Sequence, residues 1–224
     1  MIVVILSFTI LNLSSQVSAQ PQESNCNIIS KSLNSKQASQ FEYNLNAIRN
    51  QVAMGRRANH KGQIQPASDM HIATWSQELA KLAQKCSETC PEHPLYCRHY
   101  KAQQGFLIHK QLVHTDKWNI DPDLILNEWM QSKQSSQQLL QSMLFQIGCG
   151  KAMSSNLGEY VVYVVCYFDY PNKQEPYRPS SSLNVANSCR LGRSSSYTAL
   201  CTSPYQKEQG VMQLTRRHRE IVSK

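Results

Sequence analysis

The sequence predicts an α+β fold that is stapled by disulfide bonds. Several segments repeat apolar residues at helical spacing, and a continuous apolar and β-branched run over 160–168 indicates a strand covered on both faces. Eight cysteines, an even number, suit an oxidising compartment. The length allows one domain of ordinary size with a hydrophobic core of its own.

Residues 1–19 are typical of a secretory signal peptide. Apolar residues fill nearly all of 2–13, and small residues stand at 17–19, where signal peptidase cleaves. The apolar run is shorter than the roughly 20 residues that a membrane span needs, and no later stretch is longer. We therefore expect a secreted, extracellular chain without a transmembrane segment. An uncleaved N-terminal anchor is the alternative.

The chain is basic, with a formal net charge of +8. This charge favours anionic partners such as sulfated glycans, lipid headgroups or acidic proteins, although it also serves general solubility. Part of it lies in a C-terminal run that contains Arg216, Arg217 and Arg219, which we expect to form a polar tail. Nucleic acid is not expected as a partner, because no recognisable reading module is present in this secreted chain.

Two helices are expected near the N-terminus. Apolar residues recur on one helical face over 41–52, and Gly55 provides a stop, after a polar, irregular segment over 20–40 that Cys26 anchors. A second apolar face runs over 72–86, with Ser68 or Asp69 as the capping residue.

The middle of the chain is less regular. The stretch 86–113 shows little periodicity and is expected to be loop-rich and tied down by disulfides. A third helix should begin at Asp121 and Pro122, a capping residue followed by proline at the first helical position. The polar run 131–138 is either an exposed helical face or a loop.

The last regular element should be a β-hairpin. Residues 148–153 pair with 160–168, and an antiparallel register in which paired residue numbers sum to 315 places Cys149 opposite Cys166. A disulfide between these two cysteines would clamp the open end of the hairpin. The chain after Pro171 is rich in Pro and Ser, and the local pair of Cys189 and Cys201 is its expected staple.

The remaining four cysteines are also expected to form disulfides. Their spacing could suit a zinc knuckle in a cytosolic protein, but a secreted chain uses such residues as disulfide partners. The four allow three pairings, and the sequence leaves the choice open. They are Cys26, Cys86, Cys90 and Cys97.

Three stretches together resemble the CAP superfamily of cysteine-rich secretory, insect antigen 5 and plant pathogenesis-related proteins. They are Leu45-Asn46-Ala47-Ile48-Arg49, Pro66-Ala67-Ser68-Asp69-Met70 with the following Trp75 to Ala80, and Gly148-Cys149-Gly150 to Cys166. The spacing of Cys90 and Cys97 is similar to that of insect antigen 5. The resemblance implies a three-layer α-β-α sandwich.

This resemblance divides the chain into four parts. They are a signal peptide over 1–19, an N-terminal extension over 20–40, a CAP-like domain over 41–172 and a Pro/Ser-rich, basic tail over 173–224.

The chain departs from the family at the central cleft. Typical members line this cleft with two His and two Glu that hold a divalent metal. The first His corresponds here to Pro94, and the Glu of a Gly-Glu-Asn motif corresponds to Gln111. The second Glu, three residues after a Trp, is Ser132, and the second His, fourteen residues before Cys149, is Ser135. We therefore expect neither a metal nor another cofactor.

No other catalytic arrangement is apparent. The sequence has no nucleophile elbow, no unpaired cysteine is expected, and Glu128 stands alone as a carboxylate. We expect a non-catalytic binding or effector protein of reproductive fluid, venom, saliva or defence, with an unknown extracellular partner.

One alternative is a metal-assisted hydrolase that uses loop histidines. The other is a binder of anionic glycans or lipid surfaces. The candidate histidines are His93, His99, His109 and His114.

Overall fold

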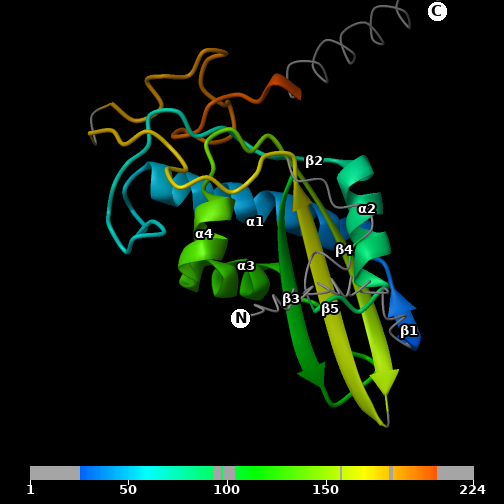
Figure 1. Ribbon diagram of the computed structural model, residues 1–224. Helices are drawn as coiled ribbons and strands as arrows, with labels where there is room; N and C mark the ends of the chain where they lie inside the picture. The colour runs from blue at the N-terminus through cyan, green and yellow to red at the C-terminus, as the bar shows by residue number, and fades with distance from the viewer. Residues whose placement is uncertain (1–25, 93–96, 98–103, 157, 182–183, 206–224) are drawn as a thin grey trace, which may run out of the picture.

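The computed structural model describes residues 26–92, 97, 104–156, 158–181 and 184–205. The elements follow one another as shown in Figure 1. They are β1 (Ile28–Lys31), α1 (Ser35–Ala53), β2 (Thr74–Trp75), α2 (Gln77–Ser87), β3 (Gly105–Val113), α3 (Pro122–Gln131), α4 (Lys133–Leu139), β4 (Gln146–Asn156) and β5 (Glu159–Phe168).

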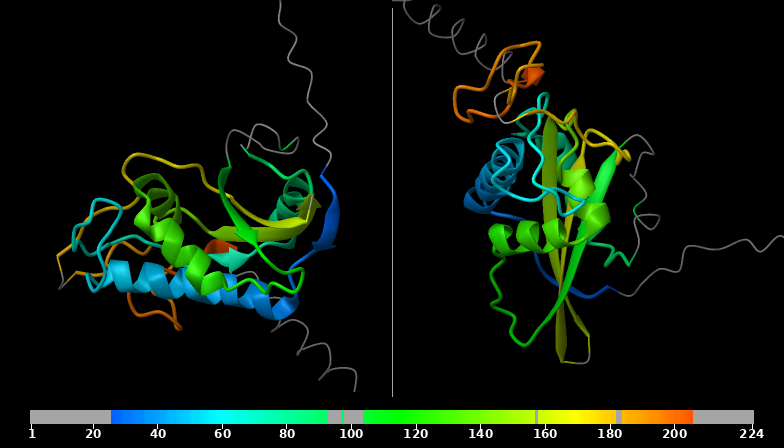
Figure 2. Two further views of the ribbon diagram at one scale, coloured as in Figure 1. Left: turned by 90° about the horizontal axis from the view of Figure 1, so that it is seen from below. Right: turned by 90° about the vertical axis from the view of Figure 1, so that its left-hand side faces the viewer.

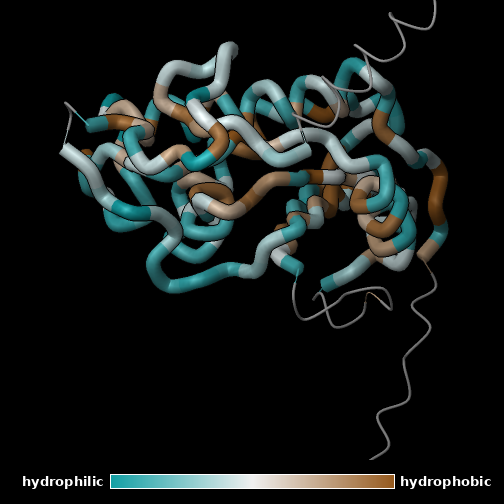
Figure 3. Tube along the Cα trace, turned by 90° about the horizontal axis from the view of Figure 1, so that it is seen from above, coloured by the Kyte–Doolittle hydropathy of each residue, from teal (hydrophilic) through white to brown (hydrophobic). Residues whose placement is uncertain are grey.

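The fold is the three-layer α-β-α sandwich that the sequence indicated. A central sheet has the order β1-β4-β5-β3, and the short β2 pairs in parallel with β4. Helices α1 and α3 pack on one face over a large apolar cluster, and α2 packs on the other face over a smaller one. Figure 2 shows these layers from two further directions. The hydropathy colouring in Figure 3 shows apolar stretches through the middle of the molecule and hydrophilic outer loops.

Helix α1 begins six residues earlier than its apolar pattern indicated, at Ser35 instead of Phe41. Asn34 and Gln37 form a capping box, in which each side chain accepts a hydrogen bond from the other residue's backbone N–H. The first turns are mostly exposed and polar, so they carry no apolar period. The segment 20–40 was therefore wrongly expected to be irregular throughout, because β1 also lies within it.

Helix α2 begins later than expected, because its cap is Ser76 and not Ser68 or Asp69. The Ser76 side chain accepts a hydrogen bond from the N–H of Leu79 at 3.3 Å. The preceding residues are extended, and Thr74–Trp75 form β2. Their apolar side chains happened to match a helical period, but a strand pairs them with β4.

The hairpin register is confirmed, since the residue numbers of every β4–β5 pair sum to 315. The sequence missed β3, which lies within the stretch 86–113 that was expected to be loop-rich. This edge strand pairs antiparallel with β5 along its whole length. Its apolar start gives way to His109, Lys110 and Gln111, and these polar residues hide the strand pattern. The polar run 131–138, left open between helix and loop, contains most of α4.

Two glycines let α2 approach the sheet closely. A Cβ added to Gly148 would overlap backbone atoms of Ala80, and a Cβ added to Gly150 would overlap those of Gln84. Because side chains alternate along a strand, Cys149 points to the opposite face, into the large apolar cluster. In the sequence Gly-Cys-Gly, the two glycines therefore allow α2 to pack on one face of β4, while Cys149 packs into the apolar cluster on the other face.

All eight cysteines are paired. The first two bonds resolve the pairing that the sequence left open, and they tie the start of β1 and the end of α2 to the segment that follows α2. The third joins the residues placed opposite each other by the register, and the fourth lies in the C-terminal segment. The bonds are Cys26–Cys90, Cys86–Cys97, Cys149–Cys166 and Cys189–Cys201.

The first part of the expected C-terminal tail is docked on the domain. Tyr177, Ala199 and Leu200 are buried in an apolar cluster with Val52 and Met70. Residues of 173–181 and 184–205 therefore pack against the C-terminal end of α1, in addition to being held by the disulfide. The basic run with Arg216, Arg217 and Arg219 lies outside the described residues.

The close approach of α2 gives a test of the fold. Gly150→Ala should lower the free energy of unfolding by about 3 kcal/mol, because backbone on both sides must shift to admit a methyl group. Gly62→Ala is the control, since Gly62 has open space around its Cα and a φ of +72°, so only backbone strain of about 1 kcal/mol is expected. Urea denaturation with the disulfides intact measures both, and equal losses would contradict the packing argument.

Candidate functional site

The structure brings three of the polar residues considered above together between β3 and α3. The His109 imidazole is 6% exposed, and its Nδ1 lies 3.1 Å from Oε2 of Glu128, without the alignment of a hydrogen bond. Its Nε2 lies 3.4 Å from Oε1 of Gln111, two residues along the same strand face. Glu128 itself is 63% exposed. His109 therefore links the edge of the sheet to α3, and Glu128 is not alone as the sequence suggested.

Ser132 and Ser135, which the resemblance aligned with a Glu and a His of the family's metal site, lie at the junction between α3 and α4. Ser132 is the N-cap of α4, and its hydroxyl accepts a hydrogen bond from the N–H of Ser135 at 3.4 Å. Its carbonyl accepts a hydrogen bond from the hydroxyl of Ser136 at 2.7 Å. Ser132 therefore has a local structural role, in which it ends one helix and begins the next.

The other expected positions do not join this group. Pro94, His93 and His99 lie outside the described residues. His114 is exposed beyond the end of β3, five residues from His109, which corresponds to about 16 Å along an extended strand. Within the described part of the chain, no three His, Cys, Asp or Glu side chains are grouped so that they could hold a metal ion.

Asn46 and Arg49 belong to the first stretch that resembles the CAP family. Both are buried on α1, and their side chains bind backbone groups of neighbouring segments. Asn46 donates its side-chain N–H to the Ala73 carbonyl at 2.7 Å and accepts the Ala73 N–H at 2.8 Å. Arg49 is fully buried. Burial lowers the pKa of Arg49 to about 9, against the opposing effect of the negative charges of Asp169 and Asp69. The residue nevertheless stays charged near neutral pH.

Arg49 donates hydrogen bonds to three backbone carbonyls. The acceptors are His71, reached by Nε at 3.1 Å and by Nη2 at 2.7 Å, Leu139 at 2.5 Å and Gln141 at 2.9 Å. Leu139 is the last residue of α4, so the guanidinium binds carbonyls at a helix C-terminus, where positive charge is favourable. In the sequence, the signal for this role is a charged residue, Arg49, placed among the apolar positions of a helical face.

A profile of the CAP family, described as the cysteine-rich secretory protein family, matches residues 42–168. The chain belongs to this family. The match extends from α1 to the end of β5 and so contains the frame held by Asn46 and Arg49, the His109 group and the hairpin disulfide. No curated protein matches the chain by sequence.

Solved structures with the CAP fold align over most of this chain. BmVAL-1 matches at a TM-score of 0.59 and 16% identity, over 76% of this chain and 96% of that one. NaASP2, in a crystal structure with Zn²⁺, matches at 0.55 and 15% identity, over 75% and 96%. Na-ASP-1 matches at 0.54 and 17% identity, over 76% of this chain and 46% of that one. These identities show a shared fold only.

The role of Ser132 in this CAP domain can be separated from that of Ser135. Ser132→Ala removes the cap of α4 and should lower the free energy of unfolding by about 1 kcal/mol. Ser135→Ala should change it by less than about 0.5 kcal/mol, because Ser135 contributes only its backbone N–H to the cap. Urea denaturation of both variants and of Ser132→Asp, which keeps a capping oxygen, measures the difference. A larger loss for Ser135→Ala would contradict the assignment.

Proposed function

We propose that this CAP-domain protein is secreted and acts by binding an extracellular partner, without catalysis. One observation carries the proposal: the polar side chains between β3, α3 and α4 contact one another or cap a helix. His109 lies between Glu128 and Gln111, and Ser132 caps α4. Neither a nucleophile with a neighbouring base nor a set of metal ligands is found among the described residues.

Secretion is supported by the N-terminal segment and by the cysteines. Residues 1–19 have the pattern of a signal peptide, and every cysteine is in a disulfide, the state that persists in an oxidising compartment. Among the described residues, none of the helices has the length and hydropathy needed to cross a membrane. Reproductive fluid, venom, saliva and host defence are the settings that we propose for the secreted chain.

The scaffold suits a binding role. Disulfides constrain the unfolded chain, so surface loops are presented from a framework that resists opening. Binding residues are commonly found on loops that a rigid scaffold positions. The partner that we propose is an extracellular protein or an anionic surface.

A metal-assisted hydrolase is the rival function from the enzyme class. A zinc ion was present in the NaASP2 crystal structure, and His109 and Glu128 are both of ligand type. Catalytic zinc sites use three protein ligands plus water. The other side chain that contacts His109 through a ring nitrogen is that of Gln111, a neutral amide, and the hydroxyl of Ser132 is used as a helix cap.

Zinc titration tests the non-catalytic proposal. The chain that begins at Gln20, purified from the medium of expressing cells, should bind no stoichiometric zinc at pH 7.4 in isothermal titration calorimetry. The reason is that the pair of His109 and Glu128 has no third ligand among the described residues. His109→Ala is the matched variant. One equivalent of tightly bound zinc that disappears in this variant, or in His93→Ala, would overturn the proposal and favour the hydrolase.

The net charge of +8 supports anionic glycans or lipid surfaces as a class of partner. Truncation after Leu214 should leave the melting temperature nearly unchanged and weaken binding to heparin or acidic liposomes at low salt. Salt screens such attraction over about 8 Å at physiological ionic strength, so the difference should shrink as salt is added. Full-length protein with Gln at 216, 217 and 219 is the control for charge alone. Loss of secretion or a large drop in melting temperature would contradict this view of the tail.

A further inference from the structure

A lysine on the central strand β4 lies inside the apolar face of the sheet. Lys151 is only 8% exposed. Side chains alternate along a strand, so it shares its face with Cys149 and Met153, and both belong to the large apolar cluster under α1. Its partner across the ladder is Val164 of β5, another member of that cluster. The environment of the Lys151 stem is therefore hydrocarbon and disulfide.

The backbone of Lys151 is held from both sides. The Gln84 side chain of α2 accepts the Lys151 N–H at 3.1 Å and donates to the Lys151 carbonyl at 2.9 Å. The N–H of Ser32 donates to the same carbonyl, also at 2.9 Å. The backbone position from which the Lys151 side chain starts is thus fixed between β1 and α2.

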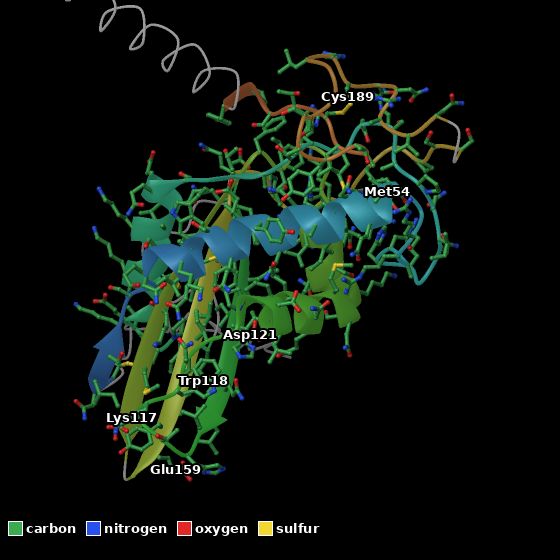
Figure 4. The ribbon with its side chains drawn as sticks, turned by 180° about the vertical axis from the view of Figure 1, so that it is seen from behind. Met54, Lys117, Trp118, Asp121, Glu159 and Cys189 are labelled. Atoms are coloured by element: carbon green, nitrogen blue, oxygen red, sulfur yellow. A yellow bond between two sulfur atoms is a disulfide. The ribbon has the colours of Figure 1, made fainter. Side chains whose placement is uncertain are left out.

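The amine has no partner among the described residues: no hydrogen bond or ion pair of its nitrogen is found there. The nitrogen is also absent from the fully enclosed unpartnered atoms of this part of the chain, so it retains contact with solvent. Leu33 and Trp118 pack at the margin of the same cluster and are only partly buried. Figure 4 shows Trp118 below α1, over the strands on the same side of the sheet.

Burial without a counter-ion changes the chemistry of this amine. Desolvation lowers the pKa of Lys151, and no charge among the described residues adds to or opposes this effect. A larger share of neutral amine makes a lysine nucleophilic, as in enzymes that form Schiff bases from desolvated lysines. Lys110 on β3 provides the contrast, because its hydrogen bond to Glu92 raises its pKa and it is exposed.

We propose that Lys151 is a covalent capture site for small neutral aldehydes. The ammonium group first releases one proton to solvent. The neutral amine nitrogen then attacks the carbonyl carbon to form a carbinolamine, which loses water to give an imine between Nζ and the former carbonyl carbon. The amine gives up its two N–H protons, and the carbonyl oxygen leaves with them as water. No oxidant or reductant is needed for this reversible step.

The surroundings favour an aldehyde over an anion as the ligand. An anion would have to lose its hydration inside a cluster that offers one cation and no further donors from Cys149, Met153 or Val164. A neutral aldehyde has far less hydration to lose than an anion has. The imine also removes the buried positive charge, so capture relieves the desolvation of the ammonium group. The small exposed fraction restricts capture to small aldehydes.

Peptide mapping of the disulfide-intact mature protein tests the proposal. Wild-type protein is treated with limiting benzaldehyde and sodium cyanoborohydride at pH 7.4, which traps each imine as a stable amine, and is then digested for mass spectrometry. We expect Lys151 to be labelled at least tenfold more than Lys110. Labelling of Lys151 equal to or below that of Lys110 would overturn the proposal, whether the cause is poor access or ordinary reactivity.

Two variants give an independent readout by intact mass. Lys151→Arg keeps the charge but removes the reactive amine, so the first adduct should be lost. Lys110→Arg should leave the first adduct unchanged. Circular dichroism checks that each variant is folded, and the wild-type map decides the question if Lys151→Arg does not fold. An undiminished first adduct in folded Lys151→Arg would overturn the assignment.

Discussion

The structure depends most on the buried guanidinium of Arg49. It is fully enclosed, and its hydrogen bonds reach carbonyls of the segment before β2, of the end of α4 and of the residues that follow α4. An enclosed charge costs several kcal/mol unless its hydrogen bonds are made. The three segments must therefore assemble around α1 together. The position of α4, and with it the cap at Ser132, follows from this requirement.

This constraint shows which residues stabilise the CAP scaffold of this chain. Asn46 and Arg49 lie in the first stretch that resembles the family, and the side chains of both form hydrogen bonds with backbone groups. Gly148 and Gly150 of the third stretch serve the packing of α2. These residues of the first and third stretches therefore stabilise the fold. Between β3 and α3 lies the His109–Glu128 pair, and Ser132 caps α4.

The sequence predicted elements well where local chemistry and burial agree. The capping residue Asp121 and Pro122 placed α3 correctly, and cysteine spacing gave the hairpin register. The sequence-based prediction failed for elements whose conformation depends on contacts with distant parts of the chain. Periodicity could not separate extended Thr74–Trp75 from a helix, because β4 supplies their partner. The strand β3 was hidden by three consecutive polar residues whose partners are tertiary, since His109 lies against Glu128 of α3 and Lys110 pairs with Glu92. No local pattern marks Lys151, whose burial follows from its register.

The most direct test of this account is the stability of Arg49→Met, measured by urea denaturation with all disulfides intact. Arg57→Met is the control, since Arg57 makes one side-chain bond, to Asn127, and is only partly buried. The account predicts a loss of about 3–5 kcal/mol for Arg49→Met, because the carbonyls of His71, Leu139 and Gln141 lose their common donor. It predicts a loss below about 1 kcal/mol for the control. An Arg49→Met protein as stable as the wild type would contradict the account.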